Sequence, residues 1–213
     1  APQVDEIFPY ITGSYAPITA GGADMLWDLS GIGTSEATNL TVESPDATAF
    51  GDIYPSATLA LDGGNVIQYM RTDANGLYIV GAYKLLAQHN IQIHYTDDSL
   101  FLPYPSTYNT AFTDAYAYNY GYTGGTVNGG GNSAYVADGF GTLVLPYDTI
   151  YNVLKLSGTD TVSESIPGQS YVTAVNQVYF YKPDIHYEVL SATALSQSVN
   201  GGPPATGFGL IYL

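Results

Sequence analysis

The chain has 213 residues, enough to bury one hydrophobic core, and 46% of them are hydrophobic. Its 4 Lys and Arg residues stand against 19 Asp and Glu residues, and the formal net charge of -15 repels phosphate backbones and anionic lipids. We therefore expect no nucleic-acid partner. No apolar run reaches the length of a transmembrane helix, so we expect no membrane insertion, and the absence of Cys excludes disulfide and thiolate chemistry.

The N-terminal segment, residues 1–17, contains three prolines around a short apolar patch. Proline cannot donate a hydrogen bond to a central strand, so this segment is predicted to be an N-terminal arm or an edge strand. It packs either on its own domain or on a neighbouring subunit by strand addition. The apolar side chains that would make this contact are Ile7, Phe8, Tyr10 and Ile11.

The rest of the chain alternates short β-rich runs with turns of Gly, Pro, Asn and Asp, as at Gly63-Gly64 and Asp73–Gly76. Trp27 is the single Trp, and a buried structural position is favoured for it over an exposed sugar-stacking one. About a dozen short strands without a convincing helix predict one all-β domain over residues 1–213. We expect an antiparallel β-sandwich or jelly-roll.

A row of tyrosines stands at spacing two in the region 112–122. Its members are Tyr116, Tyr118, Tyr120 and Tyr122. In a strand all four rings point to one face, where they form either a half-buried wall or a contact surface that could stack on a ligand. The following glycines, Gly124-Gly125 and Gly129-Gly130-Gly131, predict a long flexible hairpin loop by composition.

The clearest local pattern is a β-hairpin with a four-residue loop between two apolar runs, Asp138–Tyr147 and Tyr151–Ser157. Its sequence, DGFGTLVLPYDTIYNVLKL, resembles the GYGTL-LP-GTY-NVLR hairpin of secreted Bacteroidota proteins exported by the type 9 secretion pathway. The resemblance implies a secretion route and a domain type, but no activity. The chain also starts without Met or a basic segment, which is typical after signal-peptide removal. We therefore expect an extracellular or cell-surface location.

No nucleophile elbow and no metal-binding histidine spacing occur, so we expect neither an enzyme nor an obligatory cofactor. Acidic turns could hold calcium through their hard oxygen ligands. The candidate ligands are Asp73, Asn75, Asp97 and Asp98. Three Asp-Ser/Thr-aliphatic triplets are similar to the O-glycosylation motif of exported Bacteroidota proteins, with Ser99, Thr149 and Thr161 as acceptors.

Two functions are compatible with these features. The first is a secreted structural or adhesive protein that assembles into a filament, sheath or layer, using strand pairing at its apolar ends and its Tyr-rich surface. The C-terminal assembly residues would be Phe208, Leu210, Ile211 and Tyr212. The partner would then be a second copy of the chain. The alternative is a carbohydrate-binding module that holds surface glycans on exposed aromatic rings.

Overall fold

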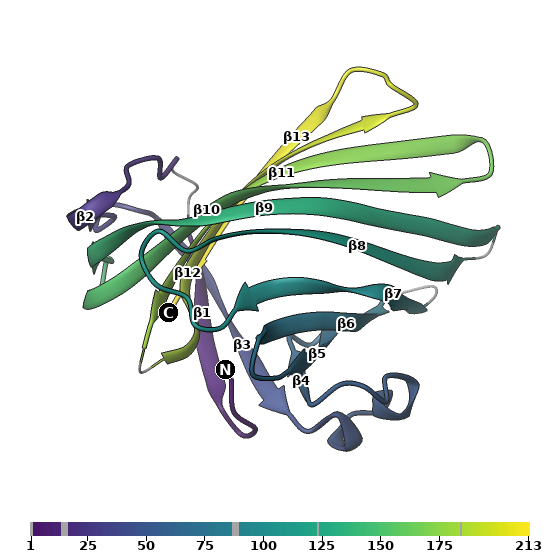
Figure 1. Ribbon diagram of the computed structural model, residues 1–213, viewed down its shortest axis with the longest axis horizontal. Helices are drawn as coiled ribbons and strands as arrows, with labels where there is room; N and C mark the ends of the chain where they lie inside the picture. The colour runs from purple at the N-terminus through teal and green to yellow at the C-terminus, as the bar shows by residue number, and fades with distance from the viewer. Residues whose placement is uncertain (1, 14–16, 87–89, 123, 184) are drawn as a thin grey trace.

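The computed structural model describes residues 2–13, 17–86, 90–122, 124–183 and 185–213 (Figure 1). Within these ranges the chain forms two 3-10 helices, η1 (Pro45–Ala47) and η2 (Gly51–Ile53), and thirteen strands. The strands are β1 (Ile7–Gly13), β2 (Gly22–Asp28), β3 (Thr34–Glu43), β4 (Leu59–Asp62), β5 (Val66–Thr72), β6 (Gly76–Leu85), β7 (Asn90–Pro103), β8 (Ala111–Tyr122), β9 (Gly125–Val144), β10 (Thr149–Ile166), β11 (Gln169–Lys182), β12 (Ile185–Val199) and β13 (Ala205–Tyr212). The described helices are too short and too polar to cross a membrane. The all-β prediction is confirmed.

Twelve of these strands form a closed barrel. From β3 to β13 each strand pairs antiparallel with the next, and β1 lies between β13 and β3 and so closes the ring. The pairing of β1 with β13 joins Ile11 to Tyr212 and Thr12 to Ile211. The remaining strand, β2, pairs in parallel with β9 and lies outside the ring, at the left of Figure 1.

The expectation of a β-sandwich or jelly-roll is wrong, because the strands form one continuous sheet whose ends meet. The N-terminal residues, predicted to be an arm or an edge strand, contain β1, which pairs with β3 from Ile7 to Gly13 and with β13 at two positions. Alternating strands satisfy a sandwich and a barrel equally well. The pairing of the first and last strands decides between them.

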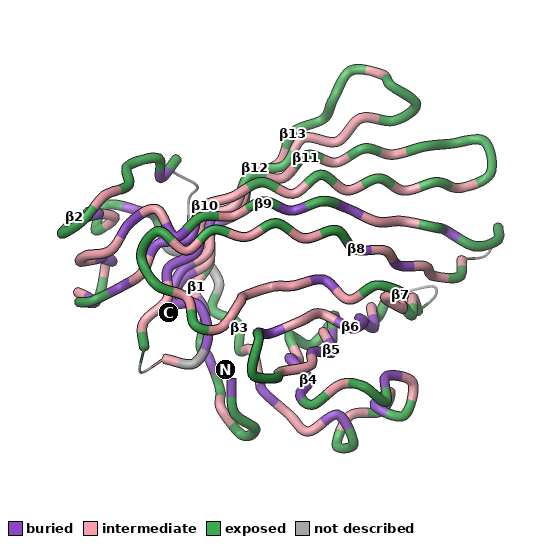
Figure 2. Tube along the Cα trace, in the orientation of Figure 1, coloured by how far each residue is buried: buried purple, intermediate pink, exposed green. Residues whose placement is uncertain are grey.

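Buried residues gather where the strands converge, near β1 and β12 (Figure 2), and they form more than one cluster. Inside the barrel, β1, β3, β4, β5, β6 and β12 contribute one cluster, which includes Tyr10, Leu61 and Met70. On the outer face, Trp27 of β2 packs edge-to-face on Phe180 of β11, with ring centroids 5.0 Å apart. Trp27 is 5% exposed, as predicted for a structural Trp.

The predicted hairpin is present, with residues 145–148 as its loop and the Leu145 N–H donating to the Asp148 carbonyl at 2.8 Å. Both strands extend much further from this loop than the sequence pattern predicts. Gly141 has a φ of +159°, and an added Cβ would lie 2.0 Å from the carbonyl oxygen of Met25. The glycine therefore allows β2 to approach the sheet closely.

Candidate functional site

An apolar cavity lies at one end of the barrel, between the β7–β8 connection, the β9–β10 hairpin and the β11–β12 turn. We call it the aromatic cavity, and its volume is about 440 Å³. Its lining residues are Leu77, Phe101, Leu102, Tyr104, Ser106, Thr107, Tyr108, Phe140, Asn152, Val153, Leu154, Tyr181, Lys182, Pro183, Ile185 and Tyr187. The cavity is thus mainly aliphatic and aromatic.

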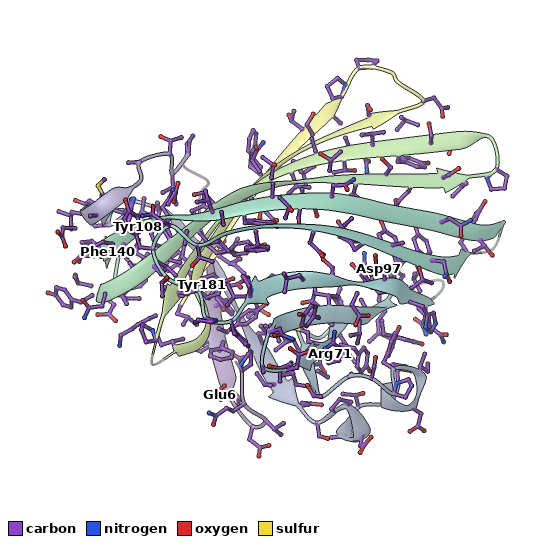
Figure 3. All side chains as sticks on the ribbon, in the orientation of Figure 1. Glu6, Arg71, Asp97, Tyr108, Phe140 and Tyr181 are labelled. Carbon is purple, nitrogen blue, oxygen red and sulfur yellow. The ribbon has the colours of Figure 1, made fainter. Side chains whose placement is uncertain are left out.

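Aromatic pairs shape this cavity. At its wall, Tyr108 and Phe140 meet edge-to-face at 5.3 Å, and Phe101 stacks on Tyr187 at 6.1 Å. Figure 3 labels Tyr108, Phe140 and Tyr181, which come from the β7–β8 connection, β9 and β11. The Tyr181 hydroxyl is buried and has no hydrogen-bond partner within the described ranges. A ligand could therefore satisfy this hydroxyl.

A second, more polar cavity of about 190 Å³ lies further inside the barrel, and we call it the carboxylate cavity. Four tyrosine rings contribute to its lining, from Tyr95, Tyr116, Tyr135 and Tyr179. The polar groups include Ser133 and Asp160, which are register partners on β9 and β10. Asp114 of β8 is the register partner of Ser133 on its other side.

The tyrosine row faces the barrel interior and its hydroxyls bind carboxylates on β10. Tyr116 donates to Asp160 Oδ2 at 2.6 Å, while Tyr118 and Tyr120 donate to Glu164 Oε1 at 2.8 and 3.3 Å. Tyr116 and Tyr118 are only 8% and 9% exposed. The row is therefore a wall of the interior rather than an open stacking platform. Tyr122, at the end of β8, is half-buried.

Gly125 and Gly129-Gly130-Gly131 lie in strand β9 and only Gly124 lies in the turn before it, so the prediction of a long flexible loop is wrong. Tyr116 and Tyr118 lie against Gly131 and Gly129, their register partners. A Cβ at Gly131 would lie 2.4 Å from the Tyr116 hydroxyl oxygen, and one at Gly129 would lie 2.5 Å from the Tyr118 ring. Glycine at these positions lets each ring cross β9 and reach its carboxylate on β10.

Burial changes the acidity of the interior groups. Desolvation raises the pKa of Asp160, and the hydrogen bond from Tyr116 offsets part of this rise. Desolvation likewise raises the pKa of Asp114, whose Oδ2 accepts the Leu100 N–H at 2.8 Å. Burial raises the pKa of Tyr120 to about 12, with Glu164 adding to the effect. Asp160 and Asp114 are therefore less favourable as anions than surface carboxylates.

Glu188 of β12 is a further buried acid that sequence reasoning missed. It is 5% exposed, and desolvation raises its pKa to about 8. Its backbone carbonyl accepts the Tyr10 hydroxyl at 2.6 Å, whereas its Oε2 has no hydrogen-bond partner in the part of the chain that the structure describes. A charged residue at a buried strand position is the only sequence signal that could have identified it.

The calcium candidates are brought together only in part. Arg71 lies between Asp73 and Asp98: it pairs with Asp73 and donates to Asp98 Oδ2 at 3.1 Å from Nη2. Asp73 Oδ1 also accepts the Asn75 N–H at 2.7 Å, and Asp97 is exposed on β7. Arg71 thus occupies the position that a cation would take between the two acids. The described residues contain no group of three or more His, Cys, Asp or Glu side chains arranged to hold a metal.

The predicted assembly segments form β1 and β13, which pair with each other as neighbouring strands of the barrel wall. Tyr10, Phe8, Leu210 and Tyr212 are buried, and Ile11 and Ile211 are half-buried. Only Ile7 and Phe208, at 60% and 64% exposure, offer apolar surface to a partner.

The three glycosylation candidates differ in exposure. Ser99 is buried and contributes to the lining of the carboxylate cavity. Thr149 is half-buried at the start of β10, and Thr161 is exposed on the same strand. Only Thr161 has the open position that a glycan requires.

The fold and its interior define an antiparallel β-barrel with cavities among its aromatic side chains. The chain matches no family model, no curated protein and no solved structure.

Proposed function

We propose that this protein binds a small, largely apolar molecule in the aromatic cavity. The observation that carries the proposal is the cavity's combination of size and lining. Its volume of about 440 Å³ lies within the range of roughly 300–1,000 Å³ typical of small-molecule sites. Such sites are mainly hydrophobic and aromatic and carry a few polar groups, and they occur in the mouths of β-barrels.

The contacts favour a flat ligand with hydrogen-bonding groups, since the hydroxyls of both Tyr104 and Tyr181 line the cavity without a partner among the described residues. Phe101, Tyr108 and Phe140 offer ring faces and edges, which pack well against another ring. The Tyr181 hydroxyl, without a partner among the described residues, can donate to a ligand oxygen or accept from a ligand donor. This arrangement would orient the ligand, while the aromatic walls would supply most of the binding free energy.

N-phenylnaphthylamine, a neutral aromatic fluorophore, tests the proposal directly. We expect its emission to rise on addition of the protein, because apolar burial removes it from water. Leu154→Trp places a large side chain in the cavity wall and should abolish the signal. Val172→Trp, at a residue 43% exposed on β11, is the matched control and should keep it. Equal binding by both variants, or no binding by the unmodified protein, would refute the proposal.

The second candidate function is the assembly of a cell-surface structure, and one observation favours it. Strand β2 pairs with β9 on one side, and within the described ranges its other edge has no strand partner. Leu26, Tyr147 and Tyr151 lie on β2 and the β9–β10 hairpin and are 65%, 74% and 63% exposed. Open edges with apolar neighbours favour strand addition.

The assembly proposal is tested by light scattering during size-exclusion chromatography at rising protein concentration. If β2 pairs between copies, the mass should increase with concentration, and Leu26→Lys should suppress that increase. Val172→Lys is the control, because it adds the same charge at an exposed strand residue outside β2. A monomer at every concentration would refute this second proposal without affecting the first.

A further inference from the structure

The carboxylate cavity contains two buried polar atoms whose hydrogen-bonding capacity is unused. Ser133 is 6% exposed, and neither its Oγ nor Asp160 Oδ1 has a hydrogen-bond partner over the residues that the structure describes. Both residues line the cavity and are register partners on adjacent strands. Leaving such buried groups without a hydrogen bond destabilises the folded protein. A ligand with donor groups would therefore be stabilised here.

The charge around these atoms excludes an anionic ligand. Asp160 is a carboxylate, and Asp114 lies close enough to raise its pKa further. In the described part of the chain, Arg71 pairs with Asp73 and Asp98, and Lys155 pairs with Asp138 rather than with Asp160. A positive ligand would supply the missing countercharge in an environment of reduced dielectric constant.

The oxygen count favours an organic cation over calcium. Calcium takes 6–8 oxygen ligands, whereas the fully buried side-chain oxygens of this cavity that have no partner in the described part of the chain are two, one carboxylate oxygen and one hydroxyl oxygen. The other Asp160 oxygen accepts from Tyr116, and the Gln177 side-chain oxygen accepts from Tyr135. An ammonium group requires only a few acceptors.

The remaining walls suit an ammonium ion. Four tyrosines contribute rings, and the face of an aromatic ring attracts a cation, most strongly when water is excluded. The volume of about 190 Å³ is below the usual range of small-molecule cavities, so the ligand must be small. The carboxylate cavity shares Tyr95 and Tyr116 with a further interior cavity of about 280 Å³, so the two are adjacent.

We propose that the carboxylate cavity binds a small organic ammonium ion inside a tyrosine cage. Asp160 Oδ1 provides the countercharge, and Ser133 Oγ accepts a hydrogen bond from a ligand N–H or O–H. The rings of Tyr95, Tyr116, Tyr135 and Tyr179 surround the charged nitrogen. This site shares Phe101 with the aromatic cavity but uses different polar groups, and it does not depend on the function proposed for that cavity.

Choline and dimethylbutanol, in which carbon replaces the charged nitrogen, form the decisive probe pair. In isothermal titration calorimetry of the unmodified protein, choline should bind at least about tenfold more tightly than its neutral isostere, which corresponds to about 1.4 kcal/mol. Equal affinities, or no choline binding at millimolar concentration, would overturn the proposal. This comparison requires no variant and is unaffected by any folding defect.

Variants then identify the residues. Asp160→Asn should weaken choline binding at least about tenfold without changing the binding of N-phenylnaphthylamine. Ser133→Ala removes an oxygen with no partner in the described fold and should weaken choline binding severalfold while the far-UV circular dichroism stays unchanged. Asp46→Asn removes one exposed carboxylate and should leave choline affinity unchanged. Unchanged affinity in a folded Asp160→Asn protein would contradict the assignment.

Discussion

The hydroxyl of Tyr116 donates to Asp160 Oδ2 at 2.6 Å, across the intervening strand β9. The contact spans three strands because the middle position is Gly131, whose missing side chain leaves room for the ring. Tyr118 and Glu164 repeat the arrangement across Gly129. These bonds link the sheet through its side chains as well as through its backbone.

Replacing the central glycine should break this link. Gly131→Val would place a Cβ 2.4 Å from the Tyr116 hydroxyl oxygen and 3.0 Å from the Thr161 carbonyl oxygen. We expect the free energy of unfolding to fall by about 1–3 kcal/mol, measured by urea denaturation. Gly209→Val is the control, since an added Cβ there meets nothing within 4 Å. Equal losses in the two variants would show that the Tyr116 contact is not the cause.

The stability of the protein should depend on the ionisation of Glu188, whose pKa burial raises from 4.5 to about 8. Below pH 4.5 the carboxyl is protonated in both states. Between pH 4.5 and about 8 the unfolded chain loses the proton and the folded protein keeps it, so the free energy of unfolding falls as the pH rises. Above pH 8 that loss is complete.

Glu188→Gln removes this ionisation while keeping the side-chain shape. The variant should match the unmodified protein below pH 4.5 and be more stable above pH 8, as measured by denaturant unfolding at both pH values. The pKa values of Asp160 and Asp114 are also raised, but both residues are present in both proteins, so the comparison isolates the effect of Glu188. Asp46→Asn should retain the original pH dependence. A constant difference between Glu188→Gln and the unmodified protein at all pH values would contradict the prediction.

An ion pair on the outer face joins two residues that differ in their exposure to solvent. Lys155 is 1% exposed, and its Nζ lies 2.9 Å from Asp138 Oδ2, whereas the Asp138 side chain is 29% exposed. Asp138→Asn leaves a buried ammonium group without its countercharge and should cost about 3–5 kcal/mol. Lys155→Met leaves a carboxylate that water can reach and should cost less. Urea unfolding of both variants measures the order, and the reverse order would contradict this explanation.

The fluorescence of Trp27 should report the docking of β2. Its indole Nε1 donates to the Ala20 carbonyl at 2.8 Å and its ring packs on Phe180, so we expect blue-shifted emission and weak quenching by acrylamide. Gly141→Val would collide with the β2 backbone at Met25 and should shift the emission to the red. The circular dichroism of the barrel strands should persist. A red shift of the Trp27 emission together with loss of the circular dichroism would show that β2 is required for the barrel itself.

The candidate site was only partly accessible from the sequence. The spacing of Tyr116 and Tyr118 correctly predicts that their rings share one face, because strand geometry alone determines this. It does not reveal their partners, since Asp160 and Glu164 lie more than forty positions away and reach the rings only through strand pairing. The aromatic cavity was missed because its walls come from separate connections and strand ends.

The sequence by itself determined the local structure of this protein. The alternating residues establish the all-β character, and the turn residues between the Asp138 and Tyr151 runs establish the hairpin, because both depend on neighbouring positions in the chain. Only the tertiary structure decided that β1 meets β13 and closes a barrel, and that the glycine stretch at 129–131 is a strand beneath tyrosine rings. Both outcomes depend on contacts between distant segments, and the same alternating pattern is compatible with an open sandwich or a closed ring.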